Sequence, residues 1–149
     1  MNRIDLMMGR IPREEKVMLY PYNDATGKRV TCRTMNPPGN LTIAGGANLE
    51  FGLYPAEAEF IDRYRVTLMD TALRHYDWYA PLPEGVGSVF LDIAYQNGAH
   101  GELMHFPAVI AYASAKKYGA AADSLLASPI AQKFLSRYRP LSEILAKGE

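Results

Sequence analysis

One segment, EGVGSVFLDIAYQNG at residues 84–98, limits the folds open to this chain more than any other. Its aliphatic and aromatic side chains do not keep to one stripe but recur around the whole circumference of a helix. A helix that is apolar on all sides has to be buried inside a domain. Asn97 and Gly98 then provide a typical helix end. The sequence therefore predicts a buried central helix at this place.

Helical patterns also flank this segment. Residues 55–76 begin with proline and two glutamates, which favours a helix start, and their apolar side chains recur every three or four residues. Shorter helices are predicted at about 106–117, 120–127 and 129–138. Ser128 is a suitable N-cap for the last of these, and Pro140 is expected to end or kink it.

The first third of the chain has a different character. Residues 20–53 are rich in Gly, Asn and Thr, a composition typical of turns and short strands. We therefore predict one domain, residues 1–149, of the α+β class and mainly helical. Its expected parts are a small N-terminal β-hairpin lobe at about 12–53, a connecting helix at about 55–76 and a helical C-terminal lobe at about 77–149.

The composition argues against several classes of function. Cys32 is the only cysteine, so an internal disulfide and a CxxC-type metal or redox site are excluded. Sixteen basic and sixteen acidic side chains cancel, which leaves no global field that would attract nucleic acid. The apolar run at the N-terminus is too short for a signal peptide or a membrane span. We expect a monomer made in a cytoplasm, without stable membrane insertion.

Carboxylates near the N-terminus are the first candidates for a site. Glu14 and Glu15 stand at the start of a short predicted helix, and Asp24 follows in an Asn-Asp turn. Each also has an ordinary structural explanation, because acids stabilise a first helical turn and Asp24 with Gly27 is typical of a tight turn. Taken one by one, these residues favour the structural explanation.

The segment LTIAGGANLE at residues 41–50 changes that balance. Leu41 and Ile43 alternate with Thr42, so a strand that buries the two aliphatic side chains directs Thr42 to its open face. The Gly45-Gly46 step lets a ligand or another backbone approach closely. An acid, a turn aspartate and a strand threonine could therefore line one side of a groove.

These segments resemble phage-type lysozymes, the T-even-like muramidases of glycoside hydrolase family 24. EKVMLYPYND is similar to the family signature E-G-L-R-L-x-x-Y-x-D, and LTIAGGANLE is similar to its L-T-I-G-x-G-x-N-L segment. Residues 78–98 and 119–145 resemble its central and C-terminal helices, so the likeness covers about residues 12–146. The resemblance implies a lysozyme-like, two-lobed fold.

The resemblance also implies an activity, hydrolysis of the β-1,4 bond between N-acetylmuramic acid and N-acetylglucosamine in bacterial peptidoglycan. In the family's pattern Glu15 is the proton donor, with Glu14 as the neighbouring alternative, and Asp24 and Thr42 hold the attacking water. Such chemistry needs one carboxyl group kept protonated and another kept ionised by their surroundings.

Supporting residues follow from the same resemblance. Arg137, or less well Arg139, corresponds to an arginine that pairs with the catalytic glutamate, although a solvated helix end explains either residue equally well. Asn97 matches a family asparagine, and Gly46 lies in the glycine-rich turn of the strand segment. No cofactor is implied. The chain would act as a phage endolysin in host lysis, reaching the cell wall in the periplasm through a holin-type lesion or another export route.

Other residues suggest different chemistry less strongly. His100, Glu102 and His105 are close in sequence, but their spacing matches no established ligand motif, so we predict no metal site. Trp78 and its polar neighbours are expected to pack between the connecting helix and the C-terminal lobe, with sugar stacking as a minor alternative.

Departures from the family pattern keep two alternatives open. Residues 29–40 form an insertion, and Ala44 and Ala47 replace a glycine and a polar residue of the pattern. A lytic transglycosylase would need only the glutamate, although the retained Asp24 and Thr42 argue against it. A lysozyme-fold protein that binds peptidoglycan or a partner without cleaving it is the alternative from another functional class.

Overall fold

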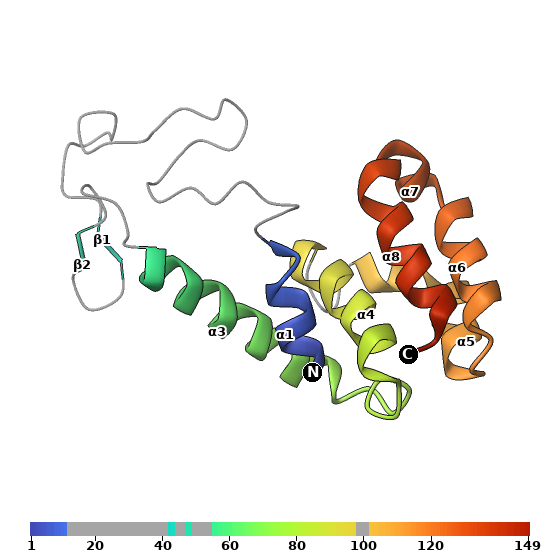
Figure 1. Cartoon of the computed structure of the whole chain (residues 1–149), viewed down its shortest axis with the longest axis horizontal. Helices are drawn as coiled ribbons and strands as arrows, with labels where there is room; N and C mark the ends of the chain where they lie inside the picture. Colours follow the sequence, from blue (N-terminus) through green and yellow to red (C-terminus); the bar gives the residue numbers. More distant parts are fainter. Residues whose placement is uncertain (12–41, 44–46, 49–54, 98–101) are drawn as a thin grey trace. The chain divides into compact units, whose positions relative to one another are not determined.

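The computed structural model describes residues 1–11, 42–43, 47–48, 55–97 and 102–149, as traced in Figure 1. The chain divides into two compact units, one formed by Met1–Glu14 with Arg63–Glu149 and the other by Glu15–Asp62. The division into lobes that the sequence suggests stays a prediction.

Helices make up most of the described residues, which confirms that the chain is mainly helical. Along the chain they are α1 (Arg3–Met8), α3 (Pro55–Leu73), α4 (Glu84–Asn97), the 3-10 helix η3 (Glu102–His105), α5 (Pro107–Ser114), α6 (Tyr118–Ala127), α7 (Pro129–Lys133) and α8 (Leu135–Lys147). Helix α3 starts at the predicted proline, and α4 matches the segment expected to form the central helix.

Strand structure among the described residues is confined to one short pairing. Strands β1 (Thr42–Ile43) and β2 (Ala47–Asn48) run antiparallel, with Thr42 opposite Asn48 and Ile43 opposite Ala47. The predicted N-terminal β-hairpin lobe is not seen in the part of the chain that the structure describes. Strands of two residues bury too few side chains to form a stable lobe by themselves.

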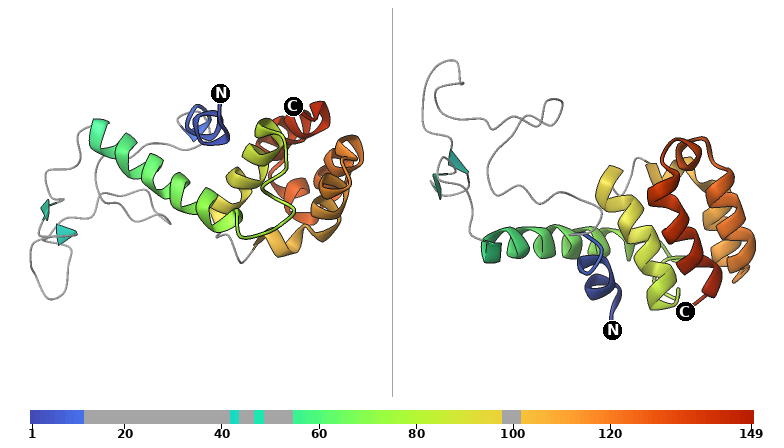
Figure 2. Two further views of the ribbon diagram at one scale, coloured as in Figure 1. Left: turned by 90° about the horizontal axis from the view of Figure 1, so that it is seen from below. Right: turned by 45° about the horizontal axis from the view of Figure 1, so that its top comes forward.

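Helix α4 is the centre of the larger unit, as the sequence predicted. Its apolar side chains are buried on all sides, among them Val86, Val89, Phe90, Leu91 and Ile93, each at most 1% exposed. Figures 1 and 2 show α4 between α1 and α8, and both of these helices pack against it. The uniform apolar pattern of the segment is therefore explained by neighbours on more than one face.

The C-terminal helices differ from the predicted arrangement. The expected helix at 129–138 is wrong: α7 ends at Lys133, and α8 begins at Leu135 and continues through Pro140. Tyr138, Leu141 and Leu145 of α8 are buried, and α8 packs against α4, α6 and α7. Because these side chains lie on both sides of the proline, their burial outweighs the hydrogen bond that Pro140 cannot donate. The predicted N-cap is confirmed, since Ser128 Oγ accepts from the Ala131 amide at 3.2 Å.

Helix α1 is held on α4 by a buried arginine. Arg3 is 2% exposed, and its guanidinium donates to Glu84 and to the carbonyl oxygens of Tyr79 and Leu82 at 2.9–3.3 Å. The hydrogen bond from Arg3 lowers the pKa of Glu84. A helix of six residues is not stable alone, so these contacts hold α1 in place. A Cβ at position 87 would lie 2.7 Å from the Arg3 guanidinium carbon, which explains the need for Gly87.

Tyr79 connects this arginine to a second acid, Asp70, which is buried. Its hydroxyl donates to Asp70 Oδ1 at 2.8 Å, and Arg74 donates to the other oxygen of Asp70 at 2.7 Å. The Arg3 guanidinium carbon lies 4.6 Å from the centre of the Tyr79 ring. Burial, followed by the hydrogen bond to Asp70, raises the pKa of the Tyr79 hydroxyl.

This environment predicts a stability loss at alkaline pH that depends on Tyr79. Because the folded-state pKa is raised, the contribution of the Tyr79 hydroxyl is fully present below about pH 10, the ordinary tyrosine pKa, and is lost as the pH rises through the folded-state value. Tyr79→Phe should be about 1.5–3 kcal/mol less stable at neutral pH, through the lost hydrogen bond to a carboxylate. That difference should shrink above about pH 10. Denaturant unfolding of both proteins across pH 7–11 measures it, and a constant difference would contradict the prediction.

Candidate functional site

The residues predicted to act on substrate fall mostly outside the described part of the chain. Glu15, Asp24 and Gly46 all lie there, and so does Glu14. Thr42 is in β1 opposite Asn48, and Asn97 is the last residue of α4, but their side chains are outside the described part. The catalytic assignments of these residues therefore stay predictions.

Arg137 lies in the first turn of α8, and its side chain is only 19% exposed. Its Nη2 donates to Asp92 Oδ1 at 2.9 Å. Asp92 is fully buried in the middle of α4. A buried ion pair of this kind holds the guanidinium in one orientation, so Arg137 is not the freely solvated helix end that the sequence left open.

A second arginine binds the same carboxylate. Arg10, 12% exposed, donates from Nε to Asp92 Oδ2 at 2.9 Å. It also donates to the hydroxyl and carbonyl oxygens of Ser88 at 3.1 and 2.7 Å. Each oxygen of Asp92 therefore accepts from a different arginine. We call Arg10, Asp92 and Arg137 the arginine–aspartate cluster.

The arginine–aspartate cluster combines distant parts of the chain. Arg10 precedes Glu15 by a few residues, whereas Asp92 is 82 positions after Arg10 and Arg137 a further 45 positions on. The cluster therefore joins the residues that follow α1 to α4 and α8.

Sequence reasoning did not single out Arg10 or Asp92. The sequence feature that indicates this cluster is Asp92 itself, a single carboxylate in the middle of a helix that is otherwise apolar on all sides. A buried carboxylate requires a cationic partner, so this position predicts an arginine or lysine from elsewhere in the chain.

The aromatic residues after α3 pack as predicted. Trp78 meets Phe90 edge-to-face, with ring centres 5.0 Å apart, and also contacts Tyr79 and Tyr76. No group of three or more His, Cys, Asp or Glu side chains suited to a metal ion occurs among the described residues. His105 is exposed in η3, while His100 and the side chain of Glu102 lie outside the described part.

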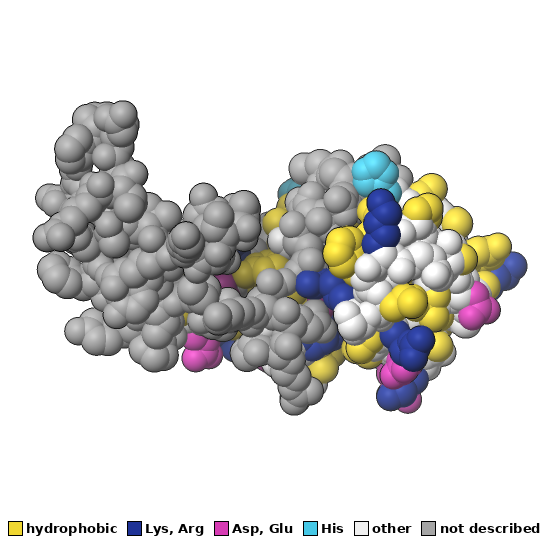
Figure 3. Space-filling model, turned by 90° about the horizontal axis from the view of Figure 1, so that it is seen from above, with side chains coloured by type: hydrophobic (Ala, Val, Ile, Leu, Met, Phe, Trp, Pro, Cys, Tyr) yellow, Lys and Arg dark blue, Asp and Glu magenta, His cyan; other side chains and the backbone are white. Residues whose placement is uncertain are grey.

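One face of the described surface gives no strong electrostatic pointer to a partner. On the face seen in Figure 3, the Lys and Arg side chains lie among apolar and acidic ones, and the described residues of that face form no continuous basic area. Within the described ranges, no helix is long and apolar enough to cross a membrane.

Comparison with models of known protein families gave no match to this chain, and comparison with curated proteins gave no significant match either.

Proposed function

We propose that this chain is a peptidoglycan hydrolase of the muramidase type, which cleaves the β-1,4 bond between N-acetylmuramic acid and N-acetylglucosamine. In this proposal the chain has a lysozyme-like fold with a small N-terminal β-hairpin lobe, and it acts on the bacterial cell wall during phage lysis. The proposal rests on the resemblance of the Glu15–Asp24 and Thr42 segments to phage-type lysozymes. Its support from the described residues is the arginine–aspartate cluster.

The proposed reaction divides the work between two carboxyl groups. Glu15, in its protonated form, gives its proton to the oxygen of the leaving sugar as the glycosidic bond breaks. Asp24 stays ionised and, with the Thr42 hydroxyl, holds the water that attacks the anomeric carbon. The water contributes its hydroxyl to the new hemiacetal and its proton to Asp24. No cofactor is required for these steps.

The arginine–aspartate cluster supports this assignment in one respect. Arg137 was assigned from sequence as the partner of Glu15, and in the structure it meets Arg10, which precedes Glu15 closely, on the single carboxylate of Asp92. An arginine beside a glutamate lowers the pKa of that glutamate, which is unfavourable for a proton donor. In the proposal Asp92 holds the guanidinium of Arg137 in one orientation, and shielding of Glu15 from water has to raise its pKa against the positive charge.

The test compares lysis by the wild-type protein with lysis by Glu15→Gln. Glutamine keeps the size of the side chain but carries no transferable acidic proton. We expect the wild type to clear outer-membrane-permeabilised Gram-negative cells and Glu15→Gln to be at least about 100-fold slower. Glu14→Gln is the matched control and should retain activity. The mass of the soluble fragments should show one added water per cleaved bond.

Each of the other possible outcomes would assign a different catalytic residue or a different function to the chain. Loss of activity in Glu14→Gln alone would move the role of acid to Glu14. Fragments that carry an anhydro sugar would identify a lytic transglycosylase. If the wild type releases no fragments but sediments with purified sacculi, the proposed hydrolysis is wrong and the chain is a binding protein.

A further inference from the structure

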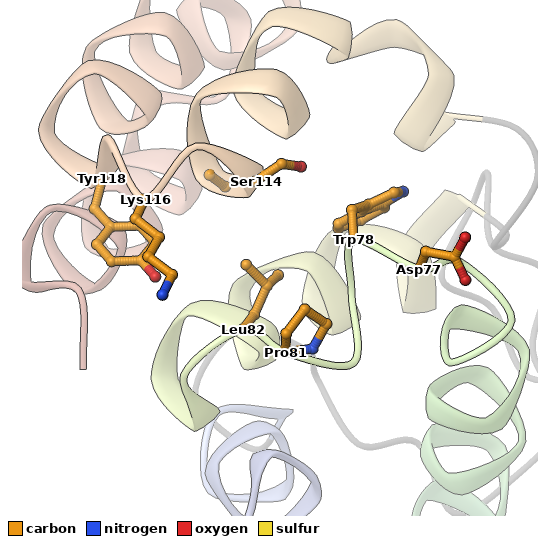
Figure 4. A pocket seen from close by; sticks show the side chains of 8 residues that line it. Asp77, Trp78, Pro81, Leu82, Ser114, Lys116 and Tyr118 are labelled. Atoms are coloured by element: carbon orange, nitrogen blue, oxygen red, sulfur yellow. The ribbon is translucent and has the colours of Figure 1, made fainter.

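A cavity of about 310 Å³ lies within the larger unit, and none of its lining residues was assigned to catalysis. The loop between α3 and α4 forms one wall with Trp78, Pro81 and Leu82, while Ser114 and Tyr118 come from the end of α5 and the start of α6. Figure 4 shows Trp78 and Tyr118 on opposite sides of this space. The volume is at the lower end of the range for small-molecule sites.

This cavity is separate from the arginine–aspartate cluster. Its wall from the α3–α4 loop ends at Leu82, just before α4 begins at Glu84. Asp92 lies eight residues beyond Glu84 on the helix, which at 1.5 Å per residue is about 12 Å along the axis. A ligand in the cavity would therefore be bound at a second site.

The cavity is bordered by a lysine in an unusual conformation. Lys116 has a φ of 58°, the only positive φ of a non-glycine residue in the described part of the chain. The amides of Lys116 and Lys117 donate to the carbonyl oxygens of Ala113 and Tyr112 at 2.9 and 2.8 Å, which closes the end of α5. This hydrogen-bond pattern usually has glycine at the position of Lys116. The backbone of a lysine in this conformation is strained, and residues with a strained backbone are often found at binding sites.

The side chains around the cavity define the chemistry of a ligand. Lys116 is exposed, and no acidic partner for it is found within the described ranges. Its ammonium group therefore suits a carboxylate. Leu82 and Ala113 offer an apolar surface for methyl groups, and the Ser114 hydroxyl, which donates to the Ile110 carbonyl oxygen at 2.7 Å, can accept from a ligand amide. In Figure 4 the carboxylate of Asp77 points away from the other labelled side chains, so it does not oppose an anion.

We propose that this cavity binds the stem peptide of peptidoglycan, a short chain of alanine, glutamate and a diamino acid with free carboxylates. This proposal rests on the proposed function for the choice of ligand. The alanine methyl groups would contact the Leu82 side of the cavity, and a peptide carboxylate would pair with Lys116. The site would keep the protein on the cell wall independently of the catalytic residues.

The chain contains its own probe for this test. Trp78 is its only tryptophan, so tryptophan fluorescence reports on the wall of the cavity. The titrant is the purified N-acetylglucosaminyl–N-acetylmuramyl disaccharide with a tetrapeptide, which lacks the bond that the proposed enzyme cuts. The same disaccharide without peptide is the control ligand. We expect saturable fluorescence changes with the first ligand and none with the second.

Lys116→Gly is the decisive variant, because glycine suits the backbone conformation at this position and the variant should fold with an unchanged or higher melting temperature. We expect its Kd for the tetrapeptide ligand to rise about tenfold through loss of the charged contact. Lys116→Arg should bind like the wild type. Lys117→Ala removes the adjacent exposed lysine, which does not line the cavity, and should also leave the Kd unchanged.

Equal affinity of Lys116→Gly and the wild type, or equal binding of the two ligands, would overturn the inference. The outcome of the binding experiment does not depend on whether the protein hydrolyses peptidoglycan. A protein that lyses cells but gives no fluorescence change would retain the proposed function and lose this site. A protein that binds the tetrapeptide through Lys116 but releases no wall fragments would retain the site and lose the proposed hydrolysis.

Discussion

Replacing Asp92 by alanine is expected to lower the free energy of unfolding by about 3–5 kcal/mol. Asp92 is fully buried, and each of its oxygens accepts from one arginine at 2.9 Å. Without the carboxylate, Arg10 and Arg137 would lose the negative charge that both of them bind, while their guanidinium groups stay partly buried. Removing one partner from a buried ion pair costs more than the pair itself contributes, because the remaining charges stay desolvated. Equilibrium unfolding in urea measures the change.

Two controls separate this effect from simpler ones. Asp92→Asn keeps the volume of the side chain, so a similar loss in both variants would assign the effect to charge and not to a cavity. Arg63→Ala breaks an exposed arginine–aspartate pair, Arg63 with Asp5 at 3.0 Å, and should cost less than about 1 kcal/mol. If Asp92→Ala costs no more than Arg63→Ala, the arginine–aspartate cluster does not stabilise the fold as described.

Arg3→Ala is expected to destabilise the protein by about 3 kcal/mol. The substitution removes the donors to the carbonyl oxygens of Tyr79 and Leu82, and it leaves a void beside the Tyr79 ring. Glu84 contributes less to this loss because its side chain is 48% exposed and water can replace the arginine. Unfolding monitored by circular dichroism gives the change in stability, with Arg63→Ala again as the exposed control.

A double-mutant cycle with Gly87 tests the packing of the same guanidinium. Gly87→Ala alone should destabilise by about 1–3 kcal/mol, because the new Cβ would meet a guanidinium held by several hydrogen bonds. In the Arg3→Ala background that clash is absent and alanine favours the helix, so the same change should be close to neutral. Additive effects of the two substitutions would show that Gly87 is not there to accommodate Arg3.

Parts of the fold that depend on local sequence were predicted well. The all-round apolar pattern of residues 84–98 predicted the buried helix α4, and Pro55 and Ser128 marked helix starts that the structure confirms. The exceptions are also instructive. Pro140 does not end α8, and Lys116 stands where a helix end favours glycine. In α8 the burial of apolar side chains on both sides of the proline outweighs its local preference.

By itself, then, the sequence determined where α3, α4, α5 and α6 lie and that α4 is buried, because hydrophobic periodicity and caps act between residues a few positions apart. It also supplied the hypothesis of a muramidase with Glu15, Asp24 and Thr42 as its catalytic residues, which awaits the lysis experiment. Only the tertiary structure showed that Arg10 and Arg137 share Asp92, and that Arg3 reaches Glu84 across 81 positions. Such pairs are selected by the desolvation of charges in a folded interior, and no local pattern along the chain encodes which distant partner will be there.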